Sequence, residues 1–260
     1  MSIILKSSRE LGLIGKACKL VAEVLGELKK KAAPGVTTAE LDELATQLTS
    51  KAGGEPLFKG VPNPQGKKPF PAVICASRNS VLVHGIPDGE PLNEGDILSI
   101  DYGARLDGYC GDAAMTLKIG PVRPDRARLL EVTRSALNLA VENCQPHRRW
   151  SEVAGTMAAF IRQEGFSVVE DFVGHGIGLT MHEDPRVPNF VDSRSDDFVL
   201  EPGLVLAIEP MVNVGTKKVK TLADGWTVVT ADSEDCAHFE HTVAITAAGP
   251  NVLTAGPWFE

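Results

Sequence analysis

The stretch LSIDYGARLDGYCGD, residues 98–112, decides the fold because it combines strand character with two acids. Its Asp-Gly pair lies between two runs of strand character, a pattern that predicts a β-hairpin. Asp101 and Asp112 lie equally far from a hairpin centre between residues 106 and 107, so we expect them opposite each other, about 5 Å apart. Two half-buried carboxylates at that distance repel each other, and a bound divalent cation would remove the repulsion. Exposed acids at a solvated hairpin tip are the alternative.

The chain on either side of this stretch shows clear helix and strand signals. Residues 8–31 carry apolar side chains every three or four positions, which predicts an amphipathic helix. Thr37 and Glu40 have capping-box spacing and predict a second helix, which ends at Gly53. Residues 55–71 contain five prolines and are predicted to form a loop. Strands are expected over residues 72–77, 80–85, 96–102 and 109–120, and further helices over 124–143 and 150–164.

The second half of the chain repeats the plan of the first. The spacing from Pro34 to Pro146 equals that from Gly53 to Gly165, and LNEGDILSID (92–101) aligns with LEPGLVLAIE (200–209). We therefore expect an α+β fold in which duplicated helix-helix-strand halves, about 1–122 and 123–260, are related by a pseudo-two-fold axis. No linker of disordered composition separates the halves, so residues 1–260 are expected to form a single domain.

Composition and charge exclude several classes of protein. A net charge of −8 disfavours nonspecific nucleic-acid binding. No apolar run approaches the roughly 18 residues that span a bilayer. The apolar run near the start of the chain is too short for a signal peptide. The five cysteines form no CxxC pair, so we interpret them as reduced thiols in a cytosolic protein, namely Cys18, Cys75, Cys110, Cys144 and Cys236.

The repeat also predicts a metal centre. The alignment pairs each acid of the hairpin with an acid of the second half, so four carboxylates would converge across the axis: Asp101, Asp112, Glu209 and Glu240. An oxygen-rich set suits Mn, Fe, Co or Zn, and bridging carboxylates suit a pair of ions. A fifth ligand is expected to be a nitrogen. His175 is the candidate because its flanking glycines allow close approach, although a histidine in that setting is more often structural.

The other histidines divide into two groups. His84 ends a predicted strand and His182 follows soon after the candidate ligand, so both could bind substrate, although core or surface positions are commoner for lone histidines. The residues after His182 do not complete an HExxH motif, which excludes a zincin. Three histidines are expected away from the site, two at the surface and the last on the strand face opposite Glu240: His147, His238 and His241.

Several motifs occur in a characteristic order along nearly the whole chain: VHGIP (83–87), GDILSIDYGARLDGYCGD (95–112), GHGIG (174–178), MHEDP (181–185), PGLVLAIEPMV (202–212), DGWTVVTAD (224–232) and FEHTVAI (239–245). With them the sequence resembles the type I methionine aminopeptidases, which are metallopeptidases of the pita-bread fold. The resemblance implies a curved antiparallel sheet. It also implies removal of the N-terminal methionine from nascent polypeptides with a small second residue, by attack of a metal-activated water.

The resemblance assigns a role to each candidate ligand. Asp101 would chelate one ion, and His175 with Glu209 would hold the other. Asp112 and Glu240 would bridge the two ions. Glu209 would in addition handle the proton of the attacking water.

The resemblance likewise suggests which residues bind the substrate. His182 would hydrogen-bond the scissile carbonyl group, and His84 the amide next to the cleaved bond. In place of the family's short loop with Tyr and Cys residues, this chain has the proline-rich stretch 55–71. The methionine side chain would contact Phe70, Met181 and Trp226, of which Met181 replaces a usual aromatic residue.

No zinc-finger or polybasic extension is expected before the catalytic region, and we expect a cytoplasmic monomer with the ribosome as a candidate partner. Two alternatives remain. One is a prolidase or aminopeptidase P of the same fold, although such chains usually carry an additional N-terminal domain. The other is a non-catalytic binding protein that kept the fold, although such relatives are expected to lose metal ligands and this sequence retains all five.

Overall fold

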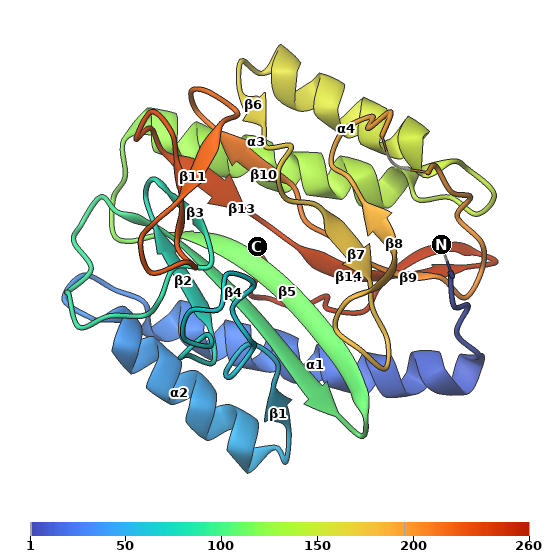
Figure 1. Ribbon diagram of the computed structural model, residues 1–260, viewed down its shortest axis with the longest axis horizontal. Coiled ribbons are helices and arrows are strands. Elements are labelled where there is room, and N and C mark those ends of the chain that lie inside the picture. The colour runs from blue at the N-terminus through green and yellow to red at the C-terminus, as the bar shows by residue number, and fades with distance from the viewer. Residues whose placement is uncertain (1, 195, 260) are drawn as a thin grey trace.

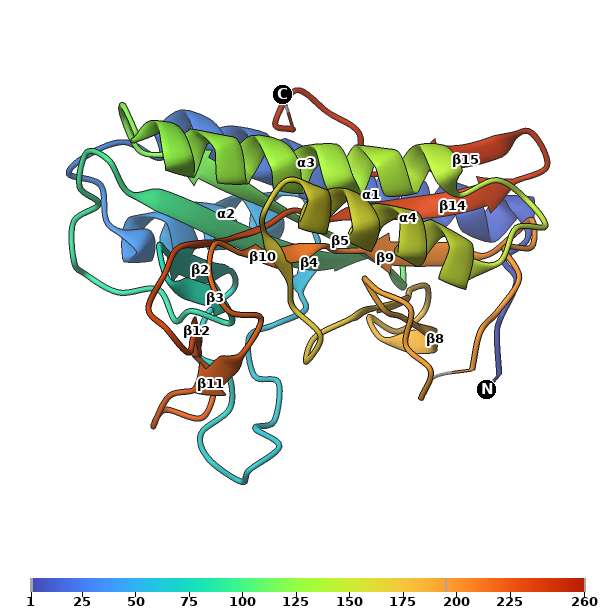
Figure 2. The same ribbon diagram turned by 90° about the horizontal axis from the view of Figure 1, so that it is seen from above.

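The computed structural model describes residues 2–194 and 196–259, and in this part of the chain four helices pack against antiparallel strands (Figure 1). All four predicted helices are confirmed. Figure 2 shows them along one side of the strands, with the segments around β8, β11 and β12 on the other side. The helices are α1 (Ser8–Lys31), α2 (Thr38–Lys51), α3 (Pro124–Asn143) and α4 (Trp150–Gln163).

The two halves begin their helices differently. Thr37 and Glu40 form the predicted capping box of α2, and Ser7 and Glu10 form another at the start of α1. Neither α3 nor α4 has a side-chain hydrogen bond from its own N-cap residue. The backbone N–H of Ser151 in the first turn of α4 instead donates to Asp197, which lies 46 residues away in sequence.

The predicted hairpin is confirmed, but its centre differs from the prediction. Strands β4 (Ile97–Leu106) and β5 (Tyr109–Lys118) pair antiparallel over ten residues, and the turn residues Asp107 and Gly108 both have positive φ. The centre therefore lies one residue later than predicted. Gly103, not Asp101, is opposite Asp112. The two acids are diagonal neighbours on the same face, and the prediction that they lie directly opposite each other is wrong.

Side chains along β4 point alternately to the two faces of the sheet, one toward the hydrophobic core and one away from it. Ile100 and Tyr102 point to the helices and are fully buried with Val21 and Leu25 of α1. Asp101, between them, points to the other face of the sheet. The same strand thus anchors the hydrophobic core and presents a carboxylate away from it.

The second half contributes a five-stranded sheet in the order β15-β14-β9-β7-β8. A bridge between Ala114 of β5 and Glu240 joins the start of β14 to the hairpin of the first half. These strands are β7 (Gly174–Gly176), β8 (Glu183–Val187), β9 (Val205–Ile208), β14 (His241–Thr246) and β15 (Gly249–Val252).

Short strands complete the molecule. β1 and β2 flank β4, while β3 pairs with β12 and β10 lies between β13 and β6. The stretch 55–71 is a loop, as predicted, apart from the two residues of β1. The strands are β1 (Glu55–Pro56), β2 (Cys75–Arg78), β3 (Val81–Val83), β6 (Ser167–Val168), β10 (Met211–Asn213), β11 (Val219–Thr221), β12 (Val228–Thr230) and β13 (Cys236–His238).

Two expectations from composition agree with this structure. All five cysteines are free and buried, so they pack as small apolar side chains. Across the described residues, no helix combines the length and the apolar character that crossing a membrane requires.

Candidate metal centre and substrate pocket

The structure brings the four predicted acids and His175 to the wall of one cavity of about 470 Å³. The hairpin β4–β5 supplies two of the acids, the residue after β9 supplies a third, and the residue before β14 supplies the fourth. Strand β7 supplies the histidine. Strands from both halves are therefore needed to assemble this site.

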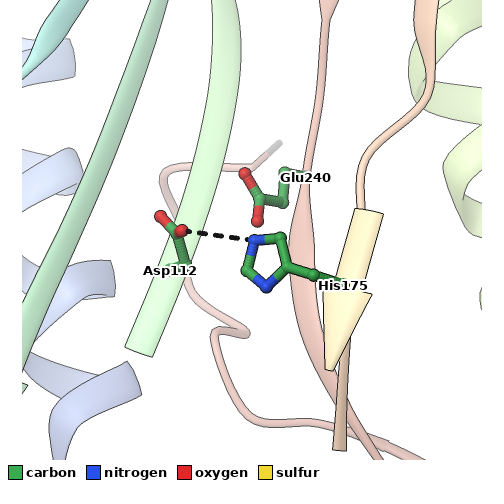
Figure 3. Close-up of side chains that lie close together, drawn as sticks. All are labelled: Asp112, His175 and Glu240. Carbon is green, nitrogen blue, oxygen red and sulfur yellow. Dashed lines mark ion pairs between the residues drawn. The ribbon is translucent and has the colours of Figure 1, made fainter. Parts of the chain in front are cut away.

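His175 faces the acids with one ring nitrogen. Its Nε2 lies 3.9 Å from Asp112 Oδ2 and 3.7 Å from Glu209 Oε1. Figure 3 shows the ring directed toward the carboxylates of Asp112 and Glu240. The other nitrogen, Nδ1, lies 2.9 Å from the carbonyl oxygen of Gly176, which assigns the N–H to Nδ1 and leaves Nε2 as a lone-pair donor toward the acids.

The glycines beside His175 have a packing role. A Cβ atom at Gly174 would overlap the carbonyl of Ala207, and one at Gly176 would overlap the carbonyl of Asp184. Strand β7 therefore fits between its neighbours only with glycine at both positions, and this close packing brings His175 to the acids.

Among the described residues, candidate ligand atoms form two tight groups that share Glu240. One group contains Asp112, His175 and Glu240, and the other contains Glu209, His238 and Glu240, with all chosen atoms of each group within 4.8 Å of one another. Asp101 lines the same cavity but belongs to neither group.

The prediction that His238 lies at the surface is wrong. This residue ends β13, has a relative exposure of 2%, and directs Nε2 toward Glu209 and Glu240. The signal was present in the sequence, because residues two apart in an extended chain point to the same side and His238 is two residues before Glu240.

The other two histidines lie away from the acids, as predicted. The side chain of His147 is 72% exposed. His241 is buried on the opposite side of β14 from the acids, where Nδ1 lies 2.9 Å from Thr254 Oγ1 and the ring packs on Trp258 and Phe259.

The electrostatics of the cluster favour a bound cation. Burial raises the pKa of Asp112 to about 7, and burial together with neighbouring carboxylates raises the pKa values of Asp101, Glu209 and Glu240 well above their ordinary range. Burial lowers the pKa of His175 to about 4, so its imidazole is neutral and forms no ion pair with the acids.

Buried polar atoms without hydrogen-bond partners also favour a bound cation. Among the described residues, the buried side-chain atoms without a hydrogen-bond partner include four of this cluster: Asp101 Oδ1, Asp112 Oδ1, His238 Nε2 and Glu240 Oε1. Buried polar atoms are normally paired, so this group lacks a partner of opposite charge. Carboxylate oxygens with imidazole nitrogens are a donor set that suits divalent transition metals, and the residues therefore fit a metal.

The two predicted substrate-binding histidines flank the acids. The rings of His182 and His175 have centroids 4.4 Å apart. His84 follows β3, adopts a φ of 56°, and places its ring against Phe172 and Trp226. Burial lowers the pKa of His182, and burial with the nearby His182 lowers the pKa of His84 to about 4, so both imidazoles are neutral.

An apolar pocket adjoins the acids. The ring centroids of Phe70 and Trp226 lie 5.3 Å apart in an edge-to-face contact, and Met181 packs against the same cluster. The three predicted pocket residues therefore come together. Sequence reasoning missed Phe58 and Cys75, and the structure pairs Cys75 of β2 with Asp101 of β4.

Buried carboxylates and neutral histidines beside an apolar pocket are the arrangement of a metal-dependent hydrolase. Residues 12–247 match metallopeptidase family M24, and the chain belongs to that family, whose members use divalent metal. It is 47% identical to methionine aminopeptidase 1 of Bacillus subtilis, over 97% of this chain and 99% of that protein.

Solved structures agree on the fold. A methionine aminopeptidase from Thermotoga maritima is 38% identical and has a TM-score of 0.92, covering 98% of this chain and 100% of that one. The prolidase from Pyrococcus horikoshii has a TM-score of 0.77 at 24% identity, over 97% of this chain and 63% of that one, which is a likeness of fold alone. The predicted pita-bread fold is confirmed.

Proposed function

We propose that this chain is a dinuclear metallo-aminopeptidase that removes the N-terminal methionine from polypeptides with a small second residue. The observation that carries the proposal is the buried group of four carboxylates and a neutral histidine beside an apolar pocket. The high identity to a methionine aminopeptidase over almost the full length of both chains supports the same reaction.

The proposed ligands divide between two ions, each Mn, Fe, Co or Zn. Asp101 would hold one ion, His175 with Glu209 would hold the other, and Asp112 and Glu240 would bridge them. Ligand atoms of Asp112, His175 and Glu209 each lie within 4.8 Å of one on Glu240, which supports a central place for Glu240 in the site. The common face of Asp101 and Asp112 on the hairpin supports their place at one centre.

The chemistry follows from charge and from hydrogen bonding. Divalent cations held there would supply Lewis-acid chemistry, which lowers the pKa of an attacking water and polarises the scissile carbonyl group. Glu209 then accepts a proton from the water and delivers it to the leaving amine. His182, neutral because of its burial, donates an N–H to the carbonyl oxygen, where negative charge develops. His84 hydrogen-bonds the amide next to the cleaved bond.

The pocket accounts for the preference for methionine. A thioether is apolar and polarisable and packs well against aromatic rings. Phe70, Met181 and Trp226 supply such a surface, and Phe58 and Cys75 extend it. The free α-amino group of the substrate lies near the acids, so cleavage is restricted to the first residue.

The proposal extends to the setting of the enzyme. We place it in the cytoplasm as a monomer that acts on nascent chains, with the ribosome as a partner. Residues 1–260 form one catalytic domain, a view supported by a site that draws ligands from both halves. Light scattering of the purified protein and cosedimentation with ribosomes test the monomer and the partner.

A peptide panel across metals tests the reaction. Metal-depleted protein is loaded with Mn, Fe, Co or Zn in turn and given Met-Gly-Met, Met-Leu-Met and Xaa-Pro peptides. We expect rapid release of methionine from Met-Gly-Met, slow release when the second residue is large, and no cleavage of Xaa-Pro. Cleavage of Xaa-Pro alone would support the prolidase alternative, and a protein that binds none of these metals would support the non-catalytic alternative.

A further inference from the structure

His238 is a buried polar residue to which the proposed function gives no role. Its side chain is 2% exposed, and its Nε2 atom has no hydrogen-bond partner among the described residues. Nε2 lies 3.7 Å from Glu209 Oε2 and 3.9 Å from Glu240 Oε2. An unpaired nitrogen at that depth is costly unless it meets a partner in the functional state of the site.

Hydrogen bonds from the first half of the chain fix the backbone of His238. Its N–H donates to Thr116 Oγ1 of β5 over 3.0 Å, and the hydroxyl of Thr116 donates to its carbonyl oxygen over 2.8 Å. On its other side His238 pairs with Met211 of β10. Its imidazole is therefore aimed at the acids by contacts that do not depend on a metal.

The two carboxylate oxygens of Glu209 face different imidazoles. Oε1 is the oxygen near His175 Nε2, whereas Oε2 is the oxygen near His238 Nε2. His175 donates its N–H to a backbone carbonyl and offers a lone pair toward the acids. A carboxylate oxygen can only accept, so the unpaired Nε2 of His238 can pair with Oε2 only by donating an N–H.

We propose that His238 is a positioning residue that donates its Nε2–H to Glu209 Oε2 and so orients Glu209 Oε1 toward the metal beside His175. The proposal rests on the proposed function, in which Glu209 is a ligand. A movement of about 0.8 Å brings the two atoms to the usual hydrogen-bond distance. Partners behind a metal ligand fix its orientation, and their loss typically weakens metal binding by about 10- to 100-fold.

The test compares His238→Ala with His238→Gln, because the glutamine amide is an N–H donor but a poor nitrogen ligand. Metal-depleted full-length protein is titrated with Co²⁺ by calorimetry, and the visible absorption of bound Co²⁺ is recorded. We expect His238→Ala to bind Co²⁺ about 10- to 100-fold more weakly than the unchanged protein. His238→Gln should recover most of that affinity and keep the positions of the absorption bands.

A matched control is His241→Gln, which alters the neighbouring buried histidine on the side away from the acids. It should leave the Co²⁺ affinity and the absorption bands unchanged, and near-UV circular dichroism checks that each variant is folded. Unchanged affinity in a folded His238→Ala variant would overturn the proposal. Shifted absorption bands in His238→Gln, with no recovery of the Co²⁺ affinity, would also overturn the proposal. His238 would then be a direct ligand.

Failure of the proposed function can be distinguished from failure of the proposed role of His238. If the unchanged protein binds Co²⁺ and cleaves Met-Gly-Met, failure of the variants refutes only the role of His238. If the unchanged protein binds Co²⁺ but cleaves no Met-initiated peptide, the titration still tests the orientation of Glu209. If it binds none of Mn, Fe, Co and Zn, both proposals are overturned.

Discussion

The two halves of the chain place their acids in the same site by different means. Asp101 and Asp112 lie on one hairpin with a two-residue turn, so local pairing alone sets their separation. Glu209 and Glu240 flank β9 and β14, which also pair antiparallel, but β10 to β13 lie between them in sequence. The first half therefore positions its acids locally, and the second half does so through tertiary structure.

Replacing a proposed bridging acid from each half gives the largest expected effect. Asp112→Asn and Glu240→Gln each remove a charge from the cluster. We expect each variant to lose most of its bound metal and its kcat/KM to fall by about 100-fold or more. Glu240 belongs to both groups of ligand atoms, so its loss should be the more severe. Elemental analysis with peptide kinetics measures both quantities. Near-normal turnover in either variant would contradict the dinuclear assignment.

Removing a substrate-binding side chain should leave the metal in place. His182→Ala is expected to lower kcat by about 100-fold, because one donor to the developing charge on the carbonyl oxygen is lost. Metal content should remain that of the unchanged protein, since the ring lies beside His175 rather than among the acids. Steady-state kinetics and elemental analysis test this pair of expectations. A variant that loses its metal would make His182 a ligand.

The stabilising effect of metal should grow with pH. Burial raises the pKa of Asp112 from 3.8 to about 7 in the folded protein, so the folded state binds this proton more tightly than the unfolded state. The resulting stability is present below the unfolded pKa and is lost as the pH rises through the folded one. Metal replaces the proton, so its addition should raise Tm more at about pH 7.5 than at about pH 5. Calorimetry at both values measures the difference, and an equal increase would refute this account.

The smallest effects concern the helix starts. Thr37→Ala removes the local cap of α2 and should lower the free energy of unfolding by about 1 kcal/mol. Asp197→Ala removes the distant acceptor at the start of α4 and should cost a similar amount. Urea denaturation gives both values. A peptide of residues 36–52 should lose helicity with Thr37→Ala, whereas a peptide of residues 149–164 lacks Asp197 and should be weakly helical from the outset.

Sequence reasoning succeeded where the signal was local. The helices, the hairpin and the acids follow from periodicity, capping spacing and the internal repeat. The predicted hairpin centre is wrong by one residue, because the symmetric placement of two acids does not locate a turn, whereas the positive φ of Asp107 and Gly108 does. The register of a hairpin is set by its turn, not by its functional residues.

His238 shows where local reasoning was insufficient. Its neighbours Cys236 and Ala237 are buried because β13 packs beside β10 and contacts α3, β3 and β5, and the sequence alone does not reveal these contacts. Spacing relative to Glu240 could have suggested a shared direction, but not the depth at which the ring is buried.

The amino-acid sequence by itself determined the helices, the strand that carries Asp101 and the set of acids, because turn chemistry, capping and side-chain alternation act over a few residues. Only the tertiary structure decided the distances within the predicted site, the edge-to-face contact of Phe70 with Trp226, and that His175 and His238 face opposite oxygens of Glu209. The physical reason is that these contacts join segments far apart in the chain, and their geometry depends on how the two halves pack together.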